Sequence, residues 1–240
     1  MEGHESALIF ALGHMTIEGK VTMSLLFVLS LLSWAVIFSK WIAVIRQRRA
    51  MRRFNEAYSQ LQDSLALDTE AKGLSQAPAL AVYEAMRDEI ERQSANGARA
   101  LSERNLPSLH AVLQNTVNIE SAALESGTII LAMAISGGPF IGLTGTVFGV
   151  METFSGVAQA GQANLSAMAP GVAGALVNTI VGLVVAIPAL FAFNLITKSL
   201  QGIQIALEGF AGDLEARVIA EHSNGERAER EPPKLAASGH

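Results

Sequence analysis

The chain has 240 residues, of which 50% are hydrophobic and only 16% are Asp, Glu, Lys or Arg. Soluble domains carry about 25% charged residues. The deficit here is uneven, because Glu152 is the only charged side chain between Ser126 and Thr197. The absence of cysteine excludes disulfides and thiol chemistry, and the net charge of −5 argues against nucleic acid as a partner. This composition indicates a membrane protein.

The first predicted transmembrane helix covers residues 21–40. Residues 21–39 are uncharged, which matches the roughly 20 apolar residues that a membrane helix needs. A cluster of arginines follows directly: Arg46, Arg48, Arg49, Arg52 and Arg53. Because such clusters stay on the cytoplasmic side, we expect residues 1–20 to form a periplasmic N-terminus.

Two further spans are predicted at residues 127–154 and 169–197, joined by a short polar periplasmic loop at residues 155–168. The run Ser136–Pro139 interrupts the second span, but membrane helices tolerate Gly and Pro where neighbouring helices satisfy the freed backbone groups. At about 1.5 Å per residue, the third span exceeds the roughly 30 Å hydrocarbon core, so it should tilt or project into the cytoplasm. The predicted fold class is all-α, with three transmembrane helices, long helices extending into the cytoplasm and a cytoplasmic C-terminus.

Three stretches are predicted to lie in the cytoplasm: a helical insert at residues 41–126, a helix at 198–220 and a disordered, charged tail at 221–240. Apolar residues recur at helical spacing in the insert and in the later helix. Such stripes need a surface to pack against, either one another or a neighbouring subunit. The stripes are Leu80, Tyr83, Met86 and Ile90; Leu106, Leu109, Leu113 and Val117; and Leu200, Ile203, Leu207, Phe210, Leu214 and Val218.

Small residues share one face of each of the last two spans. They let membrane helices approach closely, because packing rather than hydrophobic burial drives helix association in lipid. The simplest interpretation is that these faces serve packing alone. The residues predicted for them are Gly142, Gly149, Gly174 and Gly182.

Three polar side chains on or beside these faces are candidates for an ion pathway: Thr146, Asn178 and Thr179. A hydroxyl inside a membrane helix can bond its own backbone at little cost, whereas a buried, unsatisfied amide is expensive. Periodicity alone therefore leaves two interpretations open, a polar track along the helices or side chains with a purely structural role.

Glu152 lies near the predicted periplasmic end of the second span. An intramembrane ionisable group is a functional candidate by default, and the alternative is an interfacial carboxylate in contact with water. The chain has no nucleophile–base motif, phosphate-binding loop or metal-ligand spacing. We therefore expect no catalysis, no metal and no cofactor.

Two motifs carry a resemblance to a known family. Residues 138–151 (GPFIGLTGTVFGVM), followed by Phe154, resemble the second-span signature of the TolQ/ExbB/MotA proton-channel family. Residues 169–176 (APGVAGAL), continuing through Thr179 and residues 186–189 (AIPA) to Asn194, resemble its third span. The topology also matches, with the three spans of the TolQ and ExbB branches rather than the four usual for MotA.

The resemblance implies a pentameric inner-membrane channel that surrounds an ExbD/TolR-like single-span protein carrying a protonatable aspartate. Proton flow would then do work on a TonB/TolA-like protein and energise outer-membrane transport or Tol-type envelope maintenance. By motif alignment, the pore-facing threonines of the family correspond to Thr146 and Thr179. Membrane lipid is the remaining partner that the resemblance implies.

The chain departs from the family at Gly174, where typical members carry a glutamate. Asn178, and Glu152 nearer the exit, are the residues expected to supply replacement polarity. Two other classes stay open: a structural membrane scaffold without ion conduction, and an intramembrane enzyme, for which no nucleophile–base pair is present. The sequence decides neither between an ExbB-like and a TolQ-like role nor between H⁺ and Na⁺.

Overall fold

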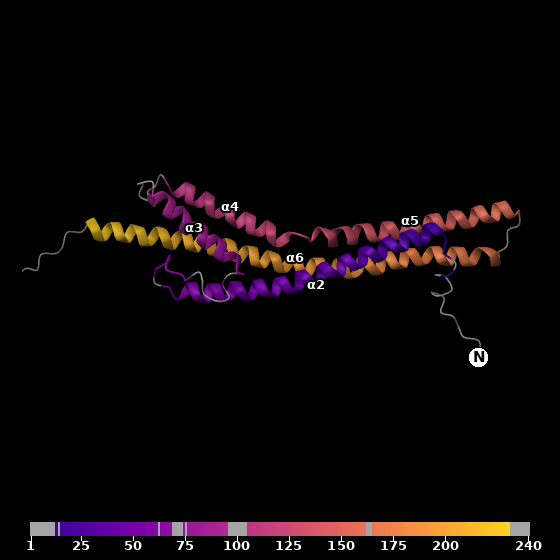
Figure 1. The fold of residues 1–240 in the computed structure, drawn as a ribbon, viewed down its shortest axis with the longest axis horizontal. Coiled ribbons are helices and arrows are strands. Elements are labelled where there is room, and N and C mark those ends of the chain that lie inside the picture. Colours follow the sequence, from indigo (N-terminus) through magenta and orange to yellow (C-terminus); the bar gives the residue numbers. More distant parts are fainter. Residues whose placement is uncertain are drawn as a thin grey trace, which may run out of the picture. The chain divides into compact units, whose positions relative to one another are not determined.

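A computed structural model describes residue 13 and residues 15–61, 63–68, 74, 76–95, 105–161 and 165–230, the last range with backbone alone at 165–167 and 222–230. These residues form five long helices and no strand (Figure 1). The all-α prediction is confirmed. The helices are α2 (Ile17–Ser59), α3 (Pro78–Ala95), α4 (Leu106–Glu125), α5 (Ile129–Ala160) and α6 (Leu165–Arg230).

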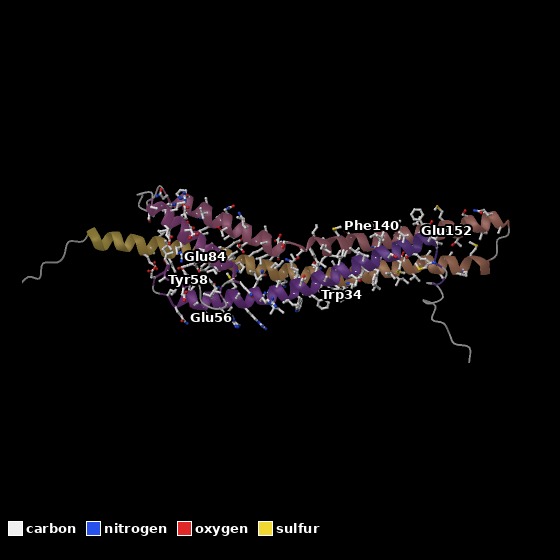
Figure 2. The ribbon with its side chains drawn as sticks, in the orientation of Figure 1. Trp34, Glu56, Tyr58, Glu84, Phe140 and Glu152 are labelled. Carbon is white, nitrogen blue, oxygen red and sulfur yellow. The ribbon has the colours of Figure 1, made fainter. Side chains whose placement is uncertain are left out.

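Three of these helices are long and apolar enough to cross a membrane: α2, α5, and α6 within Met168–Glu221. Many of their large apolar side chains point outward; Trp34 is 46% exposed and Phe140 is 69% exposed (Figure 2). In water such a surface would be unfavourable, whereas lipid tails solvate it. The prediction of three spans is confirmed.

The described chain divides into two compact units. The first, here the membrane unit, comprises the described residues within Met1–Ile42 and Ser126–Thr197; the second unit comprises those within Ala43–Glu125 and Lys198–His240. Helices α2 and α6 each contribute one part to each unit. The two units are described separately below.

The second unit has a core of large side chains from four helices. Phe54 and Tyr58 of α2, Tyr83 of α3, Leu113 of α4 and Leu207 of α6 all belong to it. The rings of Phe54 and Phe210 meet edge to face, with centroids 5.0 Å apart. The predicted apolar stripes of α3, α4 and α6 therefore pack against one another, which was the first of the two alternatives.

Two helices extend further than the sequence suggested. Helix α5 continues to Ala160 and α6 begins at Leu165, so the connection is shorter than the loop predicted at residues 155–168. The turn falls at Gly161, whose φ of 67° is a left-handed conformation typical of a helix end.

The predicted disordered tail at residues 221–240 also needs correction, because α6 runs on to Arg230. The sequence AEHSNGERAER is rich in the helix formers Ala, Glu and Arg, and it contains no proline. Residues 231–240 lie outside the described part of the chain.

Candidate functional site

Helices α5 and α6 approach each other at glycines. A methyl group added at Gly142 would lie 2.6 Å from the carbonyl oxygen of Asn178, and one at Gly149 would lie 2.8 Å from Cβ of Ala175. One at Gly182 would lie 2.5 Å from the carbonyl oxygen of Gly138. Backbone therefore meets backbone along this line of contacts, here called the α5–α6 seam, and no larger side chain fits. Gly174, the fourth glycine predicted for a packing face, is also buried.

Two threonines meet directly across the seam. The hydroxyl oxygens of Thr146 on α5 and Thr179 on α6 are 2.5 Å apart. The Thr146 hydroxyl also lies 3.0 Å from the carbonyl oxygen of Ala175 and 3.1 Å from that of Gly142. Both side chains are half-buried. The close backbone approach that the glycines permit brings these two short side chains within hydrogen-bond distance.

The proton arrangement of this pair can switch. Thr146 has one hydroxyl proton and can donate it to only one acceptor at a time. When it donates to a carbonyl, Thr179 donates to Thr146, and the free lone pairs of Thr179 can accept from a donor on the half-exposed side. When Thr146 donates to Thr179 instead, the Thr179 proton becomes available to an outside acceptor. The pair can therefore present either a hydrogen-bond donor or an acceptor without forming a charge.

Asn178 lies in a different environment from the threonine pair. Its side chain is 1% exposed, and neither amide atom has a hydrogen-bond partner among the described residues. A methyl group at Gly145 would lie 2.8 Å from the amide carbon, and one at Gly19 of α2 would lie 3.1 Å from the amide nitrogen. Asn178 therefore occupies space left by glycines of α2 and α5, while its neighbour Thr179 pairs with Thr146.

Two residues of α2 that lie beside Asn178 and Gly145, namely Gly19 and Thr22, were not predicted from the sequence. The hydroxyl of Thr22 also contacts the position of a Gly145 side chain, and it donates to the carbonyl of Gly19 at 2.9 Å or of Glu18 at 3.1 Å. The buried positions Gly19, Thr22, Leu26 and Ser33 recur at helical spacing along α2. The small or polar members of this face, Gly19, Thr22 and Ser33, were the available signal in an apolar span.

Glu152 is exposed on α5 (Figure 2). It lines a hollow of about 290 Å³. Thr16 of α2, Thr153 of α5 and Gly171 of α6 line the same hollow. The Thr153 hydroxyl donates to the carbonyl of Gly149 at 2.7 Å and packs against Gly171. Glu152 lies six residues beyond Thr146, about 9 Å along the helix axis. The hollow is therefore lined by a carboxylate and by hydroxyl groups, and residues of both α5 and α6 contribute to it.

The seam supplies no proton-binding carboxylate of its own on α6. Between residues 165 and 197 this helix has no Asp, Glu, Lys, Arg or His, and Glu152 is the only such residue in α5. No group of three or more His, Cys, Asp or Glu side chains that could hold a metal ion occurs in the described part of the chain. At the threonine pair, the described residues of α5 and α6 therefore offer hydroxyl groups and backbone carbonyls for hydrogen bonding, and no carboxylate.

The fold and the site together define a class of protein: a multi-pass helical membrane protein whose spans pack through small residues around a pair of hydroxyls. The family model that matches residues 81–208 is described as the MotA/TolQ/ExbB proton channel family. The match covers more than half of the chain and includes the seam. The chain belongs to this family.

Curated relatives of two kinds match over most of the chain. The chain is 32% identical over 214 residues to the biopolymer transport protein ExbB of Salmonella typhimurium. This alignment covers 86% of the chain and 82% of that protein. The chain is 31% identical over 181 residues to the Tol-Pal system protein TolQ of Pseudomonas aeruginosa, covering 73% and 76% respectively. The match to the ExbB of Pseudomonas putida, 30% identical, covers 87% of this chain and 63% of that longer protein.

Proposed function

We propose that this chain is the channel-forming subunit of an inner-membrane, proton-driven motor that energises outer-membrane transport or Tol-type envelope maintenance. The observation that carries the proposal is the contact between Thr146 and Thr179, 2.5 Å apart at a seam that glycines hold closed. A hydroxyl pair that can donate or accept suits a path on which a proton passes without a full charge entering hydrocarbon. The chain does no covalent catalysis in this proposal.

The half-exposed position of Thr146 and Thr179 supports an assembly of several copies of the chain. In a single chain surrounded by lipid, these hydroxyls would face an apolar solvent with part of their hydrogen-bonding capacity unused. Further copies of the chain, a pentamer by family resemblance, would enclose them around a central space. Because α6 has no carboxylate at the pair, a single-span ExbD/TolR-like protein in that space would supply the protonatable aspartate. A TonB/TolA-like protein would take up the work.

The orientation follows from charge. The arginine cluster of residues 46–53 would remain in the cytoplasm, which places the N-terminus in the periplasm and the C-terminus in the cytoplasm. The Glu152 hollow would then lie at the periplasmic end of the path and offer protons a carboxylate before they reach the seam. A cysteine introduced at residue 157 should react with a membrane-impermeant maleimide from the periplasmic side.

Asn178 is the predicted replacement for the polarity that Gly174 does not provide. The amide lies one residue from Thr179, and its two atoms have no partner among the described residues, so it can still take part in hydrogen bonds. If Asn178→Ala leaves proton transport unchanged, this compensation role is excluded while the threonine path still stands.

The test of the main proposal is proton flux into liposomes that contain the chain co-purified with its ExbD/TolR-like partner. Thr179→Val removes the hydroxyl and keeps the side-chain volume, so we expect the flux to fall to the background of empty liposomes. Thr144→Val is the matched control, because Thr144 is exposed and its hydroxyl donates to its own helix, 2.8 Å from the Phe140 carbonyl. Equal flux from both variants would place the path elsewhere.

A structural scaffold without ion conduction is the second candidate function, favoured by the buried glycine at position 174. The same experiment separates the two. A scaffold predicts that the intact complex conducts no protons in any variant, and that Thr146→Val and Thr179→Val complement a deletion strain as well as the wild-type gene does.

A further inference from the structure

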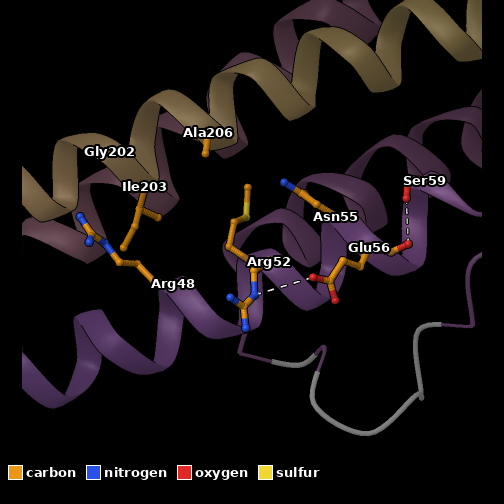
Figure 3. A pocket seen from close by; sticks show the side chains of 9 residues that line it. Arg48, Arg52, Asn55, Glu56, Ser59, Gly202, Ile203 and Ala206 are labelled. Atoms are coloured by element: carbon orange, nitrogen blue, oxygen red, sulfur yellow. Dashed lines mark hydrogen bonds and ion pairs between the residues drawn. The ribbon is translucent and has the colours of Figure 1, made fainter.

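The second unit has a groove between α2 and α6 that the proposed function does not use. It has a volume of about 550 Å³. Arg48, Arg52 and Asn55 line it from α2, and Gly202, Ile203 and Ala206 line it from α6 (Figure 3). We call it the basic groove. Arg48 and Arg52 make its rim cationic, and the apolar side chains of Met51, Ile203 and Ala206 form its floor.

The two arginines of the groove are available to an anion. They are four residues apart and therefore lie on the same face of α2. A methyl group at Gly202 would contact the Arg48 guanidinium at 3.7 Å, so the glycine leaves open the space over which Arg48 extends. Arg52 faces Glu56 at 3.7 Å, but both side chains are largely exposed, at 78% and 66%. Exposed pairs of this kind are weak, and with Arg48 and Arg52 against Glu56 the lining keeps a net charge of +1.

The position of the groove along the chain indicates the source of the anion. Residues 41–45 are uncharged, and Arg48 and Arg52 follow Ile45 by three and seven residues in the helix that contains the predicted first span. Basic clusters directly beyond a span attract anionic lipid headgroups. A free phosphate would use the arginines alone, whereas a lipid would also use the apolar floor.

We propose that the basic groove binds the phosphate of an anionic phospholipid such as phosphatidylglycerol. The guanidinium groups of Arg48 and Arg52 contact the phosphate oxygens, Asn55 and Ser59 offer hydrogen bonds to the glycerol of the headgroup, and the floor covers the upper acyl chain. The proposal requires membrane insertion but not proton conduction. A failure of lipid binding can therefore be distinguished from a failure of the proposed proton path.

The chain provides a matched control in Arg49 and Arg53. They are exposed, have the same spacing, and carry the same charge one residue further along α2, yet they do not line the groove. One residue is a rotation of about 100° around a helix. A general attraction between a basic helix and an anionic membrane would depend equally on both pairs, whereas a built groove depends on Arg48 and Arg52.

The experiment uses the full-length chain with its co-purified partner and measures phosphatidylglycerol affinity by native mass spectrometry, with phosphatidylcholine as the neutral reference lipid. We expect the double variant Arg48→Gln/Arg52→Gln to lose affinity by roughly fivefold for each arginine removed. Arg49→Gln/Arg53→Gln should stay within about twofold of wild type. Equal losses in the two double variants, or no loss in either, would overturn the proposal.

Two further arms make the result specific. Gly202→Leu fills the groove without changing its charge, and we expect it to reduce phosphatidylglycerol affinity about as much as the Arg48/Arg52 variant, with unchanged helicity and complex mass as the check on folding. Soluble glycerol phosphate at millimolar concentration should not displace the lipid. Full displacement would identify a site for soluble phosphate and contradict the assignment to a lipid.

Discussion

In the membrane unit, the contacts between α5 and α6 are made by Gly142, Gly149 and Gly182, while large apolar side chains such as Phe140 point outward. The second unit has the reverse arrangement, with Phe54, Tyr83 and other large side chains buried. The difference follows from the solvent. In lipid, apolar side chains are well solvated, so close backbone packing is what favours helix association. In water, the burial of apolar surface area is the main favourable contribution to the folding free energy. The two units should therefore respond differently to substitution: removing a large side chain should destabilise the second unit most, and enlarging a glycine should destabilise the α5–α6 seam.

The largest expected effect is the loss of a core aromatic from the second unit. Phe54→Ala removes a fully buried ring that contacts Phe210, Tyr58 and Tyr83, and should cost about 3–5 kcal/mol of folding free energy. Phe140→Ala, the same change at an exposed site of the membrane unit, should cost less than about 1 kcal/mol. Unfolding in mixed micelles, followed by circular dichroism, measures both. Similar losses at the two sites would mean that the outward face of α5 is buried against another chain.

The next effect concerns the seam, where enlarging a residue is harmful. Gly142→Ala places a methyl group 2.6 Å from the Asn178 carbonyl, so the helices must separate, at a cost of about 1–3 kcal/mol. Gly137→Ala in the same helix meets nothing within 4 Å and should be neutral or stabilising. The midpoint of thermal unfolding of the purified complex compares them. Equal tolerance at both positions would contradict the close contact at the seam.

A smaller effect, with an unusual sign, is expected at Asn178. Because neither amide atom has a described partner, Asn178→Leu exchanges an unsatisfied buried polar group for an apolar one of similar size. We expect the unfolding free energy to rise by about 1 kcal/mol. A clear decrease would show that the amide is hydrogen-bonded in the assembled protein, which would sharpen its role in the ion path.

The smallest effect is a pH dependence in the second unit. Burial alone would raise the pKa of Glu89, but hydrogen bonds from Gln93, Arg92 and Ser108 hold it below the ordinary value of 4.5. A lowered folded-state pKa stabilises the protein above the unfolded-state value, and this contribution is lost as the pH falls through the folded-state pKa.

Glu89→Gln should therefore be less stable than wild type at pH 7, and the difference should shrink below about pH 4.5. Denaturant unfolding at a series of pH values measures the difference. Glu91→Gln is the control, because Glu91 is 70% exposed and lies 3.6 Å from Arg87. A constant difference for Glu89→Gln across the acidic range would contradict the lowered pKa.

The features that depend on composition and on the periodicity of apolar residues, namely the three spans and the helical stripes, could be predicted from the sequence. Three apolar runs gave three spans, and the stripes of Leu80, Leu109 and Leu207 met in one core because each helix has a single apolar face. Helix ends were predicted less well, since polar residues such as Gln159 are good helix formers in the segment taken for a loop.

Residue pairings across helices depend on rotation and offset, which periodicity does not set. The spacing placed Thr146 and Asn178 on small-residue faces, and only the packing of the helices shows that Thr146 meets Thr179 while Asn178 turns toward Gly19 and Gly145. The position of Thr22 beside them was missed, because its hydroxyl can bond its own helix, so its presence on a small-residue face of α2 does not indicate which helix that face meets.

The proposed ion path is tested most directly by comparing proton flux through Thr179→Ser and Thr179→Val in the same reconstituted complex. Serine keeps the hydroxyl 2.5 Å from Thr146 and loses only a methyl group, whereas valine keeps the shape and loses the hydroxyl. We predict near-wild-type flux for serine and background flux for valine. Equal flux through the two variants, high or low, would contradict a proton path through the hydroxyl pair.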